Sequence, residues 1–226
     1  MKLRLWAGPV LCSVLLVSGC AGTDLTPGTA SVVNGTRITD TEVDDLADAQ
    51  CVAADRAAKS GQSTSAPVSR VKQQSLGLLM DSELSAQYAA AEGIKATKTT
   101  ADGFYKQLEP AITPLPEPAR TKLEDVFKKW ADGRAILVEA GAKETGQAPS
   151  PTNLDQLITA GLKARTAWMK KAEIDTDPRY APAKDGYPGG RSGSVSVASS
   201  TFAKNSVKPT PDPAYVSGLP ANQKCG

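Results

Sequence analysis

Histidine is absent from the 226 residues of this chain, and aromatic side chains make up only 5% of it. Without imidazole the chain has no Ser-His-Asp or Cys-His nucleophile, no histidine general base and no His-Glu-x-x-His zinc site. With so few aromatic residues to form sugar platforms, we interpret the acidic side chains as solvated helix faces rather than as glycosidase pairs. We therefore predict no catalytic residue, no metal ligand and no cofactor, and expect that the protein is not an enzyme.

A net basic charge is also missing from most of the chain. Two of the 26 basic residues, Lys2 and Arg4, precede Cys20, which leaves 24 basic residues against 24 acidic ones in the rest. A balanced chain lacks the long-range attraction to phosphates that dominates nucleic-acid binding. Nucleic acid is therefore not an expected partner.

The first 19 residues have the order of a bacterial export signal. Two basic residues precede an apolar run from Leu5 to Val17, which is too short to span a bilayer stably. The sequence Leu-Val-Ser-Gly-Cys at 16–20 resembles the lipobox of bacterial lipoproteins, which implies cleavage before Cys20 and acyl chains such as palmitate on that residue. The alternative is a buried N-terminal helix with a chance cysteine. We predict a signal peptide over residues 1–19 and an extracytoplasmic protein anchored to the bacterial cell membrane through Cys20.

Composition divides the remainder of the chain into three parts. Residues 20–30 are small, polar and turn-prone, which is typical of a flexible tether. Residues 31–180 show helical periodicity and are long enough for one domain. Residues 181–226 are rich in Pro, Gly and Ser, and beyond Asn205 they resemble a mobile tail unless Cys225 holds its end.

Only two cysteines remain once Cys12 leaves with the signal and Cys20 carries the lipid. In an oxidising compartment Cys51 and Cys225 are expected to form a disulfide that joins the end of the chain to the first helix. Two free thiols, or pairing between molecules, remain as alternatives because sequence does not show the geometry that a disulfide needs.

Two short extended segments around an Asn-Gly turn are predicted over 31–39, followed by a helix through about Lys59. The spacing of Thr39 and Glu42 predicts a capping box for this helix. Near the other end, the alternating residues 194–198 predict a strand that pairs with Val32 and Val33.

Four further helices follow from apolar residues at helical spacing. The first of them spans 68–92. The second is short, is capped by Thr99 or Thr100, and ends at the proline cluster that begins at Pro110. The third spans 119–143, and the last is capped by Asn153 and runs through Trp168.

Three aromatic side chains on the last two helices are the candidate binding residues. Phe127, Trp130 and Trp168 lie on apolar helical stripes and are expected either to pack on one another or to line a groove for apolar peptide segments. The sequence leaves both interpretations open.

The strand region Ser31–Thr39, leading into Thr41–Val43, resembles the N-terminal domain of SurA-type and PrsA-type extracytoplasmic chaperones. The sequence Asp-Thr-Asp-Pro-Arg-Tyr at 175–180 is similar to the strand to which the chain of such proteins returns after a last helix. The resemblance covers about 31–180. It implies a mainly α fold of about five helices, with a small β-sheet formed by short N-terminal and C-terminal strands.

Members of that family often carry a parvulin prolyl-isomerase module whose active site uses histidines. This chain has none, and only Gly146–Thr152 stands where the module would be inserted. The resemblance therefore implies chaperone-like binding of exported polypeptides without isomerase activity. The alternative is a structural or assembly lipoprotein that binds one folded partner of the cell envelope. The oligomeric state is not predicted.

Overall fold

The computed structural model describes residues 25–62, 65–180, 183, 185–188, 200–206, 208 and 211–226. The predicted signal peptide, Cys20 and the predicted strand at 194–198 lie outside these residues. The described part is mainly helical with a small antiparallel sheet, as predicted.

The chain begins with a hairpin of β1 (Thr29–Val33) and β2 (Thr36–Thr39). The Asn-Gly turn between them has positive φ at both residues, 47° at Asn34 and 83° at Gly35, as the right-handed twist of a tight hairpin requires. β4 (Ile174–Thr176) pairs with β1 on its other side, so the strand order is β2-β1-β4.

This order shows that the strand pairing predicted for 194–198 is wrong. Val32 pairs with Arg37 of β2 and with Asp175 of β4, so both edges of β1 are already occupied. The sheet gains its third strand from the segment that directly follows the last long helix. The Asp-Pro-Arg-Tyr sequence is not itself a strand, because Pro178–Tyr180 forms a 3-10 turn.

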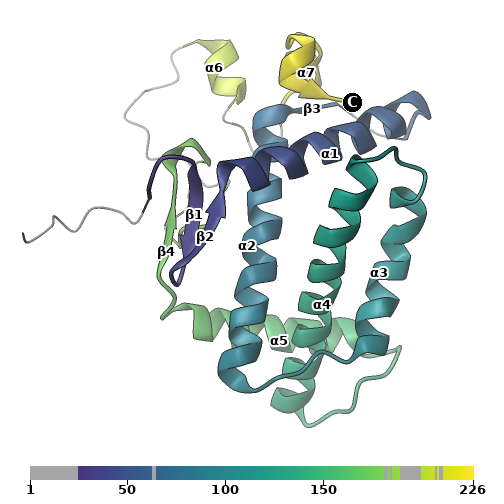
Figure 1. Ribbon diagram of the computed structural model, residues 1–226, viewed down its shortest axis with the longest axis vertical. Coiled ribbons are helices and arrows are strands. Elements are labelled where there is room, and N and C mark those ends of the chain that lie inside the picture. Colours follow the sequence, from purple (N-terminus) through teal and green to yellow (C-terminus); the bar gives the residue numbers. More distant parts are fainter. Residues whose placement is uncertain are drawn as a thin grey trace, which may run out of the picture.

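Five long helices form the body of the protein (Figure 1). They are α1 (Asp40–Lys59), α2 (Val68–Glu92), α3 (Lys98–Ile112), α4 (Ala119–Thr145) and α5 (Leu154–Met169). Helices α2, α3 and α4 run side by side, α1 lies across one end of them, and α5 crosses the other end. The sheet packs beside α2 (Figure 1).

The capping box at the start of α1 is confirmed: Thr39 Oγ1 accepts from Glu42 N, and Glu42 Oε2 accepts from Thr39 N at 2.8 Å. Two other predicted ends of helices are wrong. Helix α3 begins at Lys98 after Thr97, and it continues past Pro110 to Ile112. Proline removes one backbone donor but does not always end a helix, and here the helix ends after Ile112.

Asn153 stands at the predicted position before α5, but its side chain does not cap that helix. Its Oδ1 atom accepts instead from Ser150 N at 2.8 Å, which closes the loop before the helix. The predicted cap position is therefore correct, and the predicted cap interaction is wrong.

The C-terminal segment is docked onto the body where the structure describes it. Two short helices, α6 (Thr201–Ser206) and α7 (Pro213–Ser217), are followed by a 3-10 turn, Ala221–Gln223, and by β5 (Lys224–Cys225). Strand β5 pairs with β3 (Ala66–Pro67), the short strand before α2. The tail beyond Asn205 thus contains regular structure that the sequence pattern did not predict.

Candidate functional site

A groove of about 360 Å³ runs along one side of α2, between the sheet and α4. Strand β2 lines one side, α4 lines the other, α2 lies between them, and Glu42 in the first turn of α1 also lines the groove; Figure 1 shows β2 and α4 on either side of α2. Its lining residues are Thr36, Arg37, Ile38, Glu42, Leu79, Ser82, Glu83, Ala86, Val126, Lys129, Asp132, Gly133 and Ile136.

Hydrogen bonds from α2 hold the hairpin at this position. Asn34 Nδ2 donates to Gln87 Oε1 at 2.6 Å, and Gln87 Nε2 donates to the carbonyl oxygen of Val33 at 3.1 Å. On the other side of the turn, Glu173 N donates to Asn34 Oδ1 at 2.7 Å. The Asn-Gly turn therefore does more than reverse the chain, because its asparagine fixes the β2 wall relative to the base of the groove.

The base of the groove is apolar and its rim is charged. Ile38, Leu79, Val126 and Ile136 supply aliphatic side chains from three different elements. The charged lining residues are Arg37, Glu42, Glu83, Lys129 and Asp132, which include both signs. A rim of mixed charge neither concentrates phosphates nor repels them strongly, whereas an apolar base with polar edges suits a polypeptide segment.

Strand β2 is an edge of the sheet, because β1 lies between it and β4. Edge strands present backbone donors and acceptors that can pair with another extended chain. The groove therefore combines two features of polypeptide recognition, an edge strand and an apolar base.

The structure does not bring the three predicted aromatic residues into one groove. Phe127 and Trp130 lie together on α4, with ring centroids 6.4 Å apart, and Trp130 also contacts Phe104 of α3 at 6.4 Å. Trp168 lies instead against Tyr88 of α2 at 5.7 Å. None of the three lines the groove along α2, and each is half-buried by its neighbours.

Trp130→Ala is expected to reduce the free energy of unfolding by about 2 kcal/mol, because it removes contacts with two aromatic rings and with the guanidinium of Arg134. Urea unfolding followed by circular dichroism measures this loss. Binding of an unfolded polypeptide should not change at temperatures where the variant is folded. Weaker binding at unchanged stability would restore the predicted role of Trp130 in peptide recognition.

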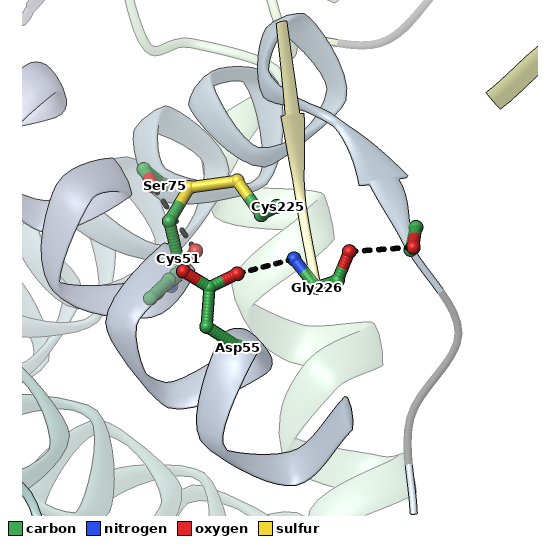
Figure 2. The surroundings of a disulfide bond; sticks show 7 residues. Cys51, Asp55, Ser75, Cys225 and Gly226 are labelled. Carbon is green, nitrogen blue, oxygen red and sulfur yellow. Dashed lines mark hydrogen bonds between the residues drawn. A yellow bond between two sulfur atoms is a disulfide. The ribbon is translucent and has the colours of Figure 1, made fainter. Parts of the chain in front are cut away.

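The disulfide between Cys51 and Cys225 links the C-terminal segment to α1, with Cα atoms 4.8 Å apart (Figure 2). Beside it, Gly226 N donates to Asp55 Oδ1 at 2.6 Å, and Ser65 Oγ donates to the oxygen of Gly226 at 2.6 Å. Cys225 is buried among apolar side chains of α1 and α2. These contacts make the end of the chain part of the folded body.

Two further charged clusters hold elements together. Arg165, only 5% exposed, donates to Asp81 Oδ1 at 2.5 Å and to Ser85 Oγ at 2.6 Å, which joins α5 to α2. Burial raises the pKa of Tyr187, near this pair, to about 12. We assign the cluster a structural role.

The second cluster joins the 3-10 turn after β4 to the start of α1. Tyr180 Oη donates to Asp40 Oδ1 at 2.9 Å, and Arg179 donates to Asp40 Oδ2 at 2.8 Å. A hydrogen bond from Arg179 also holds the pKa of the Asp177 carboxyl below its usual range. The Asp-Pro-Arg-Tyr sequence thus attaches the segment that follows β4 to the start of the first helix.

Where the structure describes the chain, no group of three or more acidic or cysteine side chains is placed to hold a metal ion. Across the same residues, no helix combines the length and the hydropathy needed to cross a bilayer.

The sequence predicts only a capping role for Glu42 and does not predict that the groove residues lie together. The signal was present in the run Leu78-Leu79-Met80, which is wider than one helical stripe and predicts apolar contacts on two sides of α2. Leu79 faces the groove, whereas Met80 is fully buried in the core.

Comparison with known proteins finds no family model, no curated protein and no solved structure that matches this chain. The function is therefore inferred from its own residues and their geometry.

Proposed function

We propose that this chain is a lipid-anchored extracytoplasmic protein that binds extended segments of exported polypeptides in a chaperone-like manner, without prolyl isomerase activity. The observation that carries the proposal is the groove along α2, which is bounded by the edge strand β2 and has an apolar base. A SurA-type scaffold is part of the proposal, supported by a sheet built from the first two strands and a strand that returns after the last long helix.

The groove offers two kinds of contact to an extended chain. Backbone groups at the edge of β2 can bind any sequence, because every residue except proline carries both a donor and an acceptor. The apolar base around Leu79 and Ile136 favours segments with aliphatic or aromatic side chains. Such a combination selects unfolded segments over folded surfaces, whose backbone groups are already paired.

The lipid anchor is proposed from the sequence alone. Cys20 follows an apolar run and two small residues, in the order that lipoprotein export requires. Two or three acyl chains on Cys20 would hold the protein at the membrane durably, because each buried methylene contributes about 0.8 kcal/mol.

Filling the groove tests the proposal directly. Ala86 is exposed and lines the groove, so Ala86→Trp places a large ring over its base. The variant is expected to bind an unfolded client about tenfold more weakly, since the indole occupies the space that client side chains would enter. Fluorescence anisotropy of a labelled unfolded peptide measures the change, with suppression of client aggregation as a second readout.

Ala90→Trp is the matched control, because Ala90 is exposed on the same helix but does not line the groove. It should bind the client as the unsubstituted protein does. Equal binding by both variants would refute the groove as the site, and absence of client binding by the unsubstituted protein would refute the chaperone-like function.

A second candidate is an assembly lipoprotein that binds one folded partner of the cell envelope. It is favoured by the small apolar surface of the described residues, where the exposed large hydrophobic side chains are Val52 at 37% and Phe202 at 57%. A general holding factor would expose a larger apolar patch. Crosslinking in intact cells followed by affinity capture distinguishes the two: one stoichiometric partner supports this candidate, and many unrelated exported proteins support the first.

A further inference from the structure

We propose that Asn34 is a modification site, at which loss of ammonia from the side-chain amide gives aspartate and isoaspartate and releases the β1–β2 hairpin from α2. The inference goes beyond the proposed function, because it rests on the hairpin and its contacts and holds whatever the groove binds. Asn34 is exposed to water, and it is the only asparagine in the sequence that a glycine follows.

The reaction needs only water and the two residues of the turn. The backbone nitrogen of Gly35 attacks Cγ of Asn34, the Cγ–Nδ2 bond breaks, and Nδ2 leaves as ammonia with the proton that the Gly35 nitrogen loses. Water then opens the resulting cyclic succinimide at either carbonyl, which gives aspartate or isoaspartate. A side chain after the asparagine would hinder the attack, but Gly35 has none, and a Cβ added there would meet nothing within 4 Å.

In the folded protein, hydrogen bonds hold both polar atoms of the Asn34 side chain. Asn34 Nδ2 donates to Gln87 Oε1 at 2.6 Å, and Asn34 Oδ1 accepts from Glu173 N at 2.7 Å. Attack on Cγ moves both atoms out of the amide plane and expels Nδ2, so both hydrogen bonds have to break. We therefore expect the reaction to run from a locally opened hairpin and to be slow in the closed one.

The orientation of Gln87 explains why the product cannot restore the lost contact. Gln87 Nε2 faces three acceptors, so Oε1 of the same amide faces position 34 and needs a donor there. The acceptors are the carbonyl oxygen of Val33 at 3.1 Å, Thr36 Oγ1 at 3.3 Å and Glu83 Oε1 at 2.7 Å. An ionised aspartate at position 34 offers acceptors only, so its carboxylate would face the Oε1 atom of Gln87 without a proton between them.

Isoaspartate also disturbs the turn itself. It adds a carbon atom to the main chain between two residues whose φ values, 47° at Asn34 and 83° at Gly35, close the tight hairpin. The ammonia escapes into solvent, so neither product returns to asparagine. Because β2 lines the groove, the same change would alter that side of the groove.

The test measures the rate of conversion at Asn34 in the whole protein. Samples are incubated at mildly alkaline pH in water labelled with heavy oxygen, so that later conversion during digestion carries no label, and the peptide that contains residue 34 is weighed. Conversion in urea-unfolded protein should be more than about tenfold faster than in folded protein. Folded Gln87→Leu should convert about fivefold faster than the folded unsubstituted protein, because it lacks the acceptor for Asn34 Nδ2.

Gln107→Leu is the matched control. Gln107 is exposed on α3, and its side chain donates to the carbonyl oxygen of Gly103 in the same helix. This variant should convert at Asn34 as the unsubstituted protein does. Folded Trp130→Ala, which loses contacts away from the hairpin, should also leave the rate unchanged. Asn222, which is exposed and precedes a glutamine, serves as the internal reference and should convert more slowly than Asn34 in urea.

Asn34→Asp copies one product and tests its consequence. Amide hydrogen exchange over 29–39 should become about tenfold faster, because the hairpin loses a hydrogen bond to α2, while exchange over α4 stays unchanged. Unchanged exchange in this variant would overturn the inference. Equal conversion of Asn34 in folded and unfolded protein would also overturn it, as would equal rates for Gln87→Leu and Gln107→Leu.

Discussion

Gly141→Ala and Gly161→Ala are each expected to lower the free energy of unfolding by about 3 kcal/mol or more. Helix α5 crosses α4 (Figure 1), and each of the two glycines faces the backbone of the opposite helix. A methyl group on Gly141 would overlap the carbonyl group of Leu157, and one on Gly161 would overlap the carbonyl group of Leu137. Backbone on both sides leaves no flexible side chain to give way, so the helices would have to move apart.

Gly103→Ala is the matched control for these substitutions. Gly103 is exposed in the middle of α3, and an added Cβ there meets nothing within 4 Å. Alanine should stabilise the protein by about 0.5 to 1 kcal/mol, because it restricts the unfolded chain and favours the helix. Urea unfolding of the three variants measures the contrast. Losses below 1 kcal/mol for both Gly141→Ala and Gly161→Ala would show that α4 and α5 do not pack as closely as described.

The same pair of glycines shows what the sequence could have revealed. Residues 137–141 read Leu-Val-Glu-Ala-Gly and residues 157–161 read Leu-Ile-Thr-Ala-Gly, so each glycine follows a buried leucine by one helical turn. The repeat indicates a small-residue face on each helix. It does not indicate that these two faces meet, because partner choice depends on the loop geometry and on the packing of the whole domain.

Local signals predicted local structure well. The Asn-Gly turn and the capping box at Thr39 both depend on neighbouring residues alone, and the structure contains both. Helix α4 was predicted to within two residues because its apolar stripe is long and a glycine follows it. The helix end predicted at Pro110 is wrong. A proline near the end of a helix removes only one hydrogen bond. The packing of Ile112 and Leu115 against α1 and α4 outweighs that loss.

The groove could not be predicted, because three elements far apart in the sequence form it. Sequence periodicity shows that Leu79 is on an apolar side of α2, but not that β2 and α4 leave that side open. The sequence pattern points instead to the large aromatic side chains, but Trp130 and Trp168 lie in separate aromatic contacts. In this chain the aliphatic residues line the groove, and the large rings stabilise the helices around it.

Cys225→Ser is expected to lower the free energy of unfolding by about 3 to 5 kcal/mol under oxidising conditions. The bond closes a loop of 174 residues, so its loss releases much of the conformational freedom of the unfolded chain. It should also free the C-terminal segment locally, because β5 forms only a short ladder with β3. Urea unfolding measures the first effect, and amide hydrogen exchange over 213–226 measures the second.

Adding a reductant separates the disulfide from the substituted side chain. It should destabilise the unsubstituted protein to the level of Cys225→Ser and leave the variant unchanged; if both proteins respond equally, the cysteines are not paired with each other. Client binding should persist in the variant while it is folded. Cys51 is nine residues from Glu42 along α1, which separates the disulfide from the groove by about 14 Å of helix. The disulfide is therefore attached to the second half of α1, whereas Glu42 in the first turn of the same helix lines the groove.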